Sequence, residues 1–560
     1  MQRRDVLAWI TVLAGCALSA AVLFLYYRTA TGSFLPAVLP QVEEDSLYYL
    51  SQVKEVLDGH PALGNPFIRE YADASFPGLR LSVWLAAVPG LFSADINVIF
   101  AVNALLYSLL TGALFYVLAM RMTSGRRALS AAGAIVGTAS LHNLLIRPVI
   151  MQTVYPAFLL FLIALFAVLQ KPHRWRRYIF LAAALSLVFY IYPFCWMTAF
   201  IAVGLLFLWR IWQRDGQALK LLLLTGAITF IICLPQILTT IALFHDPVAS
   251  LINVRSGLVE THHVLPITIL NLKYTIFLCV IVLCLRTQRR LTAPETLLLL
   301  IGTSLVIGAT SNVVTGKEMD FDTHFWRLEL VMNVLGVVAF LPAVLQKSRS
   351  LERIGAGLLA AALLFTVVNR TFIRVNAYRY LRLAAEAAPF HRSLQEYHRV
   401  FAFLREQGVH NQVILCPERM NAYIPVYTEN YVLHHFRAGL HVIPADELRA
   451  RFLTAYADRI DAAFLREGTE LYAGLRPART AVYRNAFGGN VQPIDLIGGE
   501  NYVQSALQEH AGIVQHYDQE LRRFGVTFVV VDAQDPHNPR IPASADEVFR
   551  DERFTIYRLS

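Results

Sequence analysis

Three acidic residues, Glu43, Glu44 and Asp45, stand side by side shortly after the first long apolar run of the chain. A carboxylate with like-charged neighbours and little solvent around it has a raised pKa, and it can then accept a proton from a hydroxyl group as a general base. An aromatic pair, Tyr48 and Tyr49, follows almost at once. Adjacent acids also occur in ordinary solvated loops, so the elements around the cluster must decide between a site and a loop.

The residues after the cluster predict the element that positions it. Apolar side chains recur at helical spacing in "SLYYLSQVKEVLDG", with Leu47, Leu50 and Val53 on one face. We expect an amphipathic helix parallel to the membrane surface, with the acids at its N-terminal end and Ser46 or Asp45 as its cap. The Gly- and Pro-rich segment "DGHPALGNPF" then ends the helix.

The chain as a whole has the composition of a polytopic membrane protein. Of its 560 residues, 56% are hydrophobic and 16% are charged, and the mean hydropathy is +0.48. About eleven apolar runs have the length that crosses roughly 30 Å of hydrocarbon. They lie at residues 8–27, 96–120, 128–146, 154–170, 178–192, 194–210, 220–242, 268–285, 295–313, 326–345 and 354–369. The shorter segment 79–92 suits an interfacial or re-entrant position.

The basic residues predict an orientation for these runs. With the N-terminus in the cytoplasm, the cytoplasmic loops contain 18 Lys or Arg residues, and the short outer loops contain 3, namely Arg147, Arg255 and Lys317. This asymmetry is the one that the positive-inside rule requires. The net charge of +9 therefore reports topology, and we expect no nucleic-acid partner.

Two large segments lie outside the cytoplasm in this orientation. The first is the loop 28–80, which contains the acids, and the second is residues 370–560, which follow a membrane domain of residues 1–369. In this polar tail, "NQVILC", "GVTFVVVDA" and "ERFTIYRLS" are typical of strands, and the segment 500–525 is typical of an amphipathic helix ended by Gly525. The predicted fold class is a polytopic α-helical membrane protein with a C-terminal extracytoplasmic α/β domain.

Basic and imidazole side chains recur in the other outer loops, close to membrane depth. Charges at that depth are costly unless they face a cavity or a partner. An acidic cluster on the same side as several cations therefore predicts a polar cavity at the outer leaflet. Its candidate members are His142, Arg147, Arg255, His262, His263, Lys317, His324 and Arg327.

The loop "TGKEMDFDTHFWR" also contains ligands that suit a metal ion. Asp320, Asp322 and His324 offer the oxygen and nitrogen atoms that bind Mg²⁺ or Mn²⁺. Their spacing is unspecific, and an ordinary polar connector fits the loop as well, with Arg327 reaching the lipid headgroups. A divalent cation is therefore a candidate cofactor, and the alternative stays open.

An acidic doublet in the first outer loop, about eleven spans and an outer C-terminal tail together resemble the GT-C glycosyltransferases. That superfamily includes protein O-mannosyltransferases, the catalytic subunit of oligosaccharyltransferase and the aminoarabinose transferase of lipid A. Its first loop has a motif of the DxD, DDx, DEx or EDx type. Glu44-Asp45-Ser46 fits EDx, and Glu43-Glu44-Asp45 fits a degenerate ExD. The resemblance covers residues 1–369 and this motif, and a WWDYG-like signature of oligosaccharyltransferase is absent from the sequence.

The resemblance implies an inverting glycosyltransferase at the outer face of a bacterial inner membrane. It implies a polyprenyl-phosphate-linked sugar as donor, a glycan, lipid or protein as acceptor, and Asp45 or Glu44 as general base. A phosphate leaving group also needs cations, which arginine supplies through paired hydrogen bonds and lysine as a point charge. The candidates are Arg327, Lys317, Arg255 and Arg147, while Tyr48 and Tyr49 suit the interface with membrane lipid and the polyprenyl chain.

Other functions stay open at this point. A flippase or transporter of lipid-linked glycans should carry charged residues at mid-span, and these are nearly absent. A polymerase or ligase of surface glycans would share the donor but usually depends on a large late outer loop. A scaffold whose outer domain binds a partner is a further alternative. Convergence of the acids and Arg327 at one place would favour the glycosyltransferase.

Overall fold

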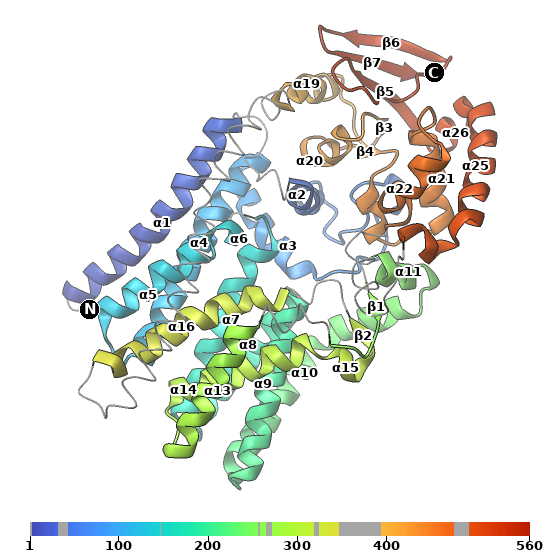
Figure 1. Ribbon diagram of the computed structural model, residues 1–560. Helices are drawn as coiled ribbons and strands as arrows, with labels where there is room; N and C mark the ends of the chain where they lie inside the picture. Colours follow the sequence, from blue (N-terminus) through green and yellow to red (C-terminus); the bar gives the residue numbers. More distant parts are fainter. Residues whose placement is uncertain are drawn as a thin grey trace.

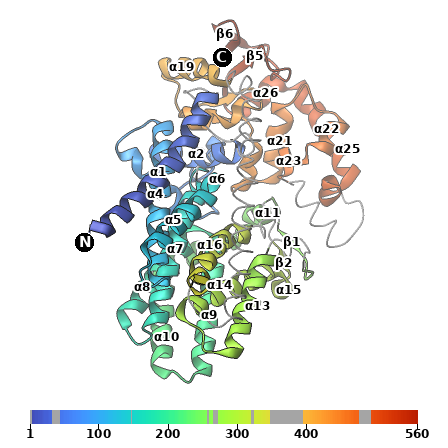
Figure 2. The ribbon, with the colours of Figure 1, turned by 60° about the vertical axis from the view of Figure 1, so that its left-hand side comes forward.

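A computed structural model gives the structure of the protein for residues 3–31, 43–145, 147–255, 258–264, 272–318, 324–345, 394–474 and 492–560. These residues form a helical bundle and a C-terminal domain that lies at one end of the bundle (Figures 1 and 2). Within the described residues, five helices are long and apolar enough to cross a membrane: Ile96–Met122, Ile150–Gln170, Pro193–Trp212, Gly216–Phe244 and Ala293–Thr315. The protein is thus a multi-pass membrane protein. The predicted span 354–369 and the predicted boundary after residue 369 lie outside the described residues.

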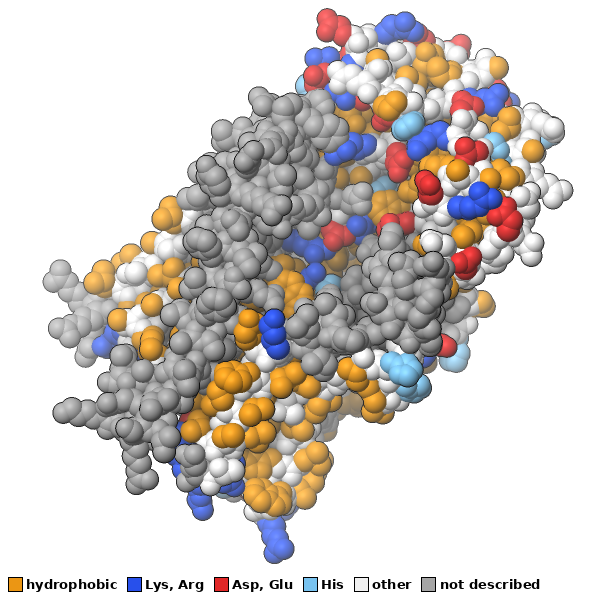
Figure 3. Space-filling view, viewed as in Figure 1, with side chains coloured by type: hydrophobic (Ala, Val, Ile, Leu, Met, Phe, Trp, Pro, Cys, Tyr) orange, Lys and Arg blue, Asp and Glu red, His pale blue; other side chains and the backbone are white. Residues whose placement is uncertain are grey.

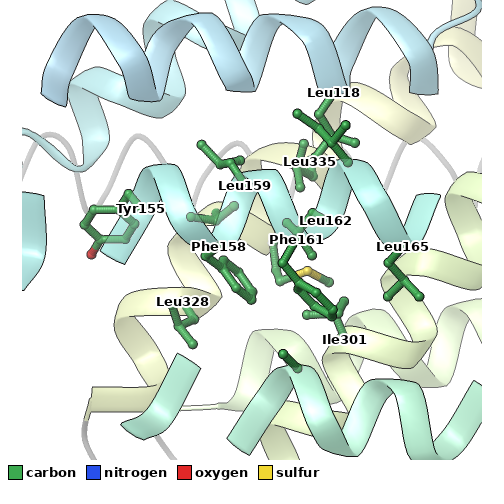
Figure 4. Close-up of a cluster of buried hydrophobic side chains, with 14 of the residues drawn as sticks. Leu118, Tyr155, Phe158, Leu159, Phe161, Leu162, Leu165, Ile301, Leu328 and Leu335 are labelled. Carbon is green, nitrogen blue, oxygen red and sulfur yellow. The ribbon is translucent and has the colours of Figure 1, made fainter. Parts of the chain in front are cut away.

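The bundle is centred on α7 (Ile150–Gln170). This helix is apolar on all sides, and it packs on α4 (Ile96–Met122), α8 (Trp175–Ile191) and α14 (Ala293–Ala309). Figure 4 shows its side chains interdigitated with those of neighbouring helices, among them Leu118, Ile301 and Leu335. A helix that is apolar all round is expected at the core of a bundle. The turn that contains Arg147 lies directly before the N-terminus of α7 and is therefore held against this core.

The other long helices complete the bundle, some of them one layer away from α7, and they follow the predicted apolar runs. They are α1 (Arg3–Thr31), α5 (Arg127–Ser140), α9 (Pro193–Trp212), α10 (Gly216–Phe244), α13 (Lys273–Gln288) and α16 (Phe325–Leu345). α10 exposes large apolar side chains such as Leu223, Phe230 and Ile231, as suits contact with lipid.

The segment predicted at the membrane interface is too short to cross. It forms α3 (Arg80–Ala87) and the 3-10 helix η3 (Val88–Leu91), and it exposes Trp84, Leu91 and Phe92. Exposed aromatic and aliphatic groups on a short helical segment are typical of an element that lies in the interface.

The C-terminal domain contains a five-stranded sheet with the strand order β4-β3-β5-β7-β6. The neighbours β4, β3 and β5 run parallel, whereas β7 is antiparallel to both β5 and β6. The strands are β3 (Val413–Leu415), β4 (Tyr431–Val432), β5 (Val526–Asp532), β6 (Ala545–Arg550) and β7 (Phe554–Leu559). The three predicted strands are therefore present.

Helices cover this sheet, and one prediction needs correction. The segment expected to be one helix forms two, α25 (Gly499–Gln515) and α26 (Tyr517–Arg523), which are separated at His516. One face of the sheet packs on α21 (Ala445–Ala455) and α26 through Val413 and Val529.

The opposite face of the sheet shares its core with the first outer loop. Ile414 and Val530 of the sheet belong to one apolar cluster with Leu47, Leu50 and Val53 of α2 (Glu43–Leu57). These three α2 side chains are at most 2% exposed. The predicted amphipathic helix is therefore confirmed, but its apolar face is covered by protein and not by the membrane surface. The C-terminal domain thus fixes the helix that begins with the acids.

Candidate functional site

Asp45 lies in the first turn of α2 and meets two arginines from distant parts of the chain. Arg147, in the turn between α6 (His142–Leu145) and α7, pairs with one carboxylate oxygen. Arg437, in the 3-10 helix η7 (Phe436–Leu440), pairs with the other. The arginine side chains are 13% and 8% exposed, respectively. The first outer loop, the bundle and the C-terminal domain therefore meet at one carboxylate.

Aromatic contacts hold Arg437 in place. Its backbone N–H donates to His435 Nδ1 at 3.2 Å. Its guanidinium lies 5.5 Å from the ring centroid of Tyr48 and 5.1 Å from that of Phe436. His435 in turn stacks on Phe67 with the centroids 4.1 Å apart. Cation–π contacts stabilise a guanidinium that has lost solvent, so the aromatic segment presents this charge to Asp45.

Tyr49 lies one turn after Asp45 on α2, next to Arg147. The Arg147 guanidinium is 5.9 Å from the centroid of the Tyr49 ring. Burial raises the pKa of the Tyr49 hydroxyl, although the nearby charges of Arg147, Arg437 and Arg327 oppose this effect. The hydroxyl therefore keeps its proton and is a hydrogen-bond donor at neutral pH.

A third arginine, Arg327, lies in the first turn of α16, near Tyr49. Its Nη1 is 3.5 Å from the sulfur of Met151, to which it donates. Just before α16, the ring Nδ1 of His324 is hydrogen-bonded to the hydroxyl of Tyr192. The structure thus brings His324 and Arg327, both predicted from the sequence, to the same region as Asp45.

Asp45, Arg147, Arg327 and Arg437 form what we call the arginine cluster. Three guanidinium groups stand near one carboxylate, so the described side chains of the cluster have a surplus of positive charge. The Nε atoms of Arg147 and Arg327 are buried and have no hydrogen-bond partner among the described residues. Buried donors without acceptors are costly, and a bound phosphate would supply acceptors in the paired geometry that guanidinium prefers.

In Figure 3, basic, acidic and histidine side chains are visible between the bundle and the C-terminal domain.

Arg255 contacts the backbone that carries Arg437. It ends α11 (Pro247–Arg255), is 3% exposed, and donates from Nη1 to the carbonyl oxygens of Ile443 at 2.9 Å and Gly439 at 3.4 Å. Burial lowers the pKa of the Arg255 guanidinium to about 10, so the group stays charged at neutral pH. A Cβ atom on Gly474 would lie 3.0 Å from the Arg255 side chain, so this glycine leaves room for it.

Three other predicted residues lie on the surface. Lys317 is exposed in β2 (Lys317–Glu318), and His262 and His263 are exposed next to the paired strand β1 (Val259–Glu260). The structure describes no contact of these three with the arginine cluster. The side chains of Glu43, Glu44 and His142 lie outside the described residues.

The predicted metal ligands Asp320 and Asp322 also lie outside the described residues. In the part of the chain that is described, no group of three or more His, Cys, Asp or Glu is placed to hold a metal ion.

Arg437 and Tyr192 are not among the residues predicted from the sequence. A usable signal for Arg437 is the stretch "NYVLHHFRAGLHVIP", which is aromatic and apolar and contains no Asp or Glu. Arg147 shows the same signal, since no acid occurs between Asp95 and Asp215. A buried arginine without an acid nearby in sequence must find its counter-ion through tertiary structure.

Comparisons with known proteins give likenesses in structure. No family model and no curated protein matches the chain. It is similar to ArnT from Cupriavidus metallidurans bound to undecaprenyl phosphate, with 14% identity, 97% of each chain covered and a TM-score of 0.37. It is also similar to the oligosaccharyltransferase of Archaeoglobus fulgidus in the apo form, with 12% identity, 94% of this chain and 69% of that chain covered, and a TM-score of 0.46. Both are protein types of the superfamily that the sequence resembles.

Proposed function

We propose that the protein is a glycosyltransferase that moves a sugar from a polyprenyl-phosphate donor to an acceptor hydroxyl at the arginine cluster. The observation that supports this most is the pairing of Asp45, from the predicted acidic motif, with Arg147 and Arg437. A carboxylate beside cations that can hold a phosphate supplies both parts of such a transfer, a base and a stabiliser of the leaving group.

In this proposal the donor phosphate binds to the three arginines of the cluster. Its oxygens accept hydrogen bonds from Arg147 and Arg437 and replace the carboxylate of Asp45 there. The exchange matters because a carboxylate held by two guanidinium groups is a weak base, and it becomes a stronger one when the phosphate takes over those contacts. Donor binding thus prepares the base.

The freed Asp45 then accepts the proton of the acceptor hydroxyl while the hydroxyl oxygen attacks the anomeric carbon. The bond between that carbon and the phosphate oxygen breaks, and polyprenyl phosphate leaves with the electron pair, its charge stabilised by the arginines. Attack opposite the leaving group inverts the configuration of the sugar. Glu44 orients the acceptor or shares the role of base.

The setting of the reaction is part of the proposal. The 18-to-3 distribution of basic residues supports a cytoplasmic N-terminus and, with it, a position of the arginine cluster at the outer face of a bacterial inner membrane. The acceptor is a glycan, a lipid or a protein. A requirement for Mg²⁺ or Mn²⁺ is tested separately, by transfer with and without a chelator.

The test is sugar transfer by the purified protein in a membrane mimetic, followed by mass spectrometry of the product. A comparison of envelope glycans from cells with and without the intact protein first identifies the sugar and the acceptor. We expect Asp45→Asn to abolish most transfer, whereas Asp215→Asn, at the other end of the bundle, is the matched control. Wild-type transfer by both Asp45→Asn and Glu44→Gln would contradict the proposal.

A further inference from the structure

A small acidic pocket of about 110 Å³ lies between the C-terminal end of α2 and the C-terminal domain. Glu55 and Asp58 line it from one side and Glu429 from the other, together with the imidazoles of His60 and His410. Among the described residues, no lysine or arginine lines it. Glu55 follows Asp45 by ten residues on the same helix, about 15 Å along its axis, so this pocket is separate from the arginine cluster.

Glu55 is a buried acid whose described ion-pair partner is the imidazole of His60, which carries a charge only when it is protonated. Its side chain is 9% exposed, and its Oε2 takes part in no hydrogen bond with the described residues. His60 Nδ1 is 3.7 Å from this oxygen, which is too far for a hydrogen bond, and Lys54 pairs with Asp58 instead. Burial raises the pKa of the Glu55 carboxyl to about 8. A buried polar group without a partner is costly, so a donor that enters the pocket would stabilise the folded protein.

The pocket is continuous with a larger groove of about 640 Å³. The two share Asp58, His410, Thr428 and Glu429. The groove has the volume of a small-molecule site. Its lining is both apolar and charged, and includes Leu57, Ile96, Phe401, Lys54 and Arg405. A molecule that places one group in the pocket can therefore lay the rest of its structure along the groove.

We propose that the pocket binds the primary ammonium group of a ligand whose remainder lies in this groove. An ammonium has one charge and three donors. These match the carboxylate of Glu55, whose Oε2 takes part in no described hydrogen bond, and the remaining acceptor capacity of Asp58 and Glu429, which pair with Lys54 and His410. The pocket has the volume of roughly three or four water molecules, enough for an aminoethyl-sized group. The described residues contain no set of three His, Cys, Asp or Glu placed for a metal ion, and this favours an organic cation.

Titration calorimetry on the purified full-length protein tests this site without any transfer reaction. The probes are glucosamine, ethanolamine and MgCl₂, and vesicles with and without phosphatidylethanolamine serve for the lipid headgroup. We expect an amine to bind and Glu55→Gln to weaken its binding about tenfold or more, the effect of a lost charge-assisted hydrogen bond.

Two further variants control the measurement. Glu429→Gln changes a more exposed acid of the same pocket, and it should weaken amine binding severalfold even if Glu55→Gln does not fold. Glu467→Gln changes an exposed acid at the end of α22 (Ala462–Glu467), and it should leave binding unchanged.

The outcomes separate the sources of the amine. Binding of glucosamine assigns an amino sugar, and binding that needs phosphatidylethanolamine assigns a lipid headgroup; either supports the site. No amine binding by the wild type, wild-type affinity in both Glu55→Gln and Glu429→Gln, or binding of Mg²⁺ alone would overturn it. Asp45→Asn should still bind the amine, so failure here and failure of the proposed transferase activity are distinguishable.

Discussion

The two ends of the helical bundle use the same charged side chains in different ways. At the end away from the C-terminal domain, Glu295 pairs with Arg289 at 2.6 Å and Asp215 with Arg210 at 3.5 Å, in each case across a few residues of sequence. At the arginine cluster, the partners of Asp45 follow it by about one hundred and about four hundred residues.

The two ends differ in how many charges and hydrogen-bonding groups have no described partner. Glu295 accepts from two nitrogens of Arg289 and from the backbone N–H of Thr292, so its oxygens are satisfied locally. Asp215 is likewise satisfied, by Arg210, by His173 at 3.1 Å and by the backbone N–H of Ala218. The arginine cluster has a surplus of positive charge and buried N–H groups without described partners. An acid shared among surplus cations, in contrast, leaves donors to which an anionic ligand can bind.

The largest effect should come from the shared acid. Asp45→Asn keeps the shape of the side chain but cannot accept a proton, so sugar transfer should fall by roughly 10²–10⁴-fold. Asp215→Asn at the other end should change transfer less than about twofold. Expression and membrane insertion should be normal for both, because acids have little influence on orientation. Similar losses of transfer in Asp45→Asn and Asp215→Asn would contradict the assignment of the reaction to the end of the bundle that contains the arginine cluster.

The second-largest effect should be on donor affinity and should come from Arg437, the cluster arginine most distant from Asp45 in sequence. Arg437→Ala removes a bidentate donor, so affinity for a polyprenyl phosphate should fall about 10- to 100-fold, and Arg437→Lys should recover part of this loss. Binding of a fluorescent polyprenyl phosphate measures it. Arg210→Ala is the control from the locally paired end. Unchanged affinity in Arg437→Ala would remove the C-terminal domain from the donor site.

A smaller effect should come from Arg255, which we expect to act through Arg437. Arg255→Ala should lower donor affinity severalfold in the wild type but add little in the Arg437→Ala background, since residues that act as a unit are not additive. Arg451, a buried arginine that bridges Glu70 and Glu447, is the control, and its effect should add to that of Arg437→Ala. Additive losses for Arg255 would show that it contributes independently of η7.

The pH dependence of the melting temperature should report the ionisation of Glu55, which lies near the C-terminal end of α2. The pKa of Glu55 is raised from 4.5 to about 8, so its neutral form is favoured in the folded state. The stability that this carboxyl contributes is therefore complete below about pH 4.5 and is lost as the pH rises through 8. Glu55→Gln should raise the melting temperature by about 2–4 °C at pH 9 and by less at pH 6. The same shift at both values would show that Glu55 does not titrate in this range.

The smallest effect on donor affinity should come from a local pair. Arg289→Ala removes the partly exposed partner of the buried Glu295, which keeps its hydrogen bond from the backbone N–H of Thr292, so the change should cost about 1–3 kcal/mol in the free energy of unfolding. Donor affinity should stay at the wild-type value. A loss of donor binding would mean that the locally paired end also communicates with the site.

Local patterns in the sequence predicted much of this arrangement. Hydrophobic periodicity located α2 with Asp45 at its start, and the distribution of basic residues put Arg147, His324 and Arg327 on the same side of the membrane. The structure brings these residues together. Hydrophobic periodicity and the loop distribution of basic residues depend only on residues near one another in sequence, so one sequence is enough to recognise them.

The remainder depends on contacts between distant segments. Periodicity shows that one face of α2 is buried, but it does not identify the protein core that covers Leu47 and Leu50. Arg437 was missed because its partner is about four hundred residues away. The break at His516 was also missed, since neither Gly nor Pro marks it.

The shared core of α2 and the C-terminal sheet has a consequence for biosynthesis. Leu47, Leu50 and Val53 emerge early from the ribosome, whereas Ile414 and Val530, which belong to the same cluster, emerge near the end. Early residues of the same cluster, such as Phe67 and, in α3, Val83, can cover part of the apolar face of α2 at once, but the rest stays uncovered until the C-terminal domain has been made. A chain truncated before β5 lacks much of this cover and should be recognised by quality-control proteases.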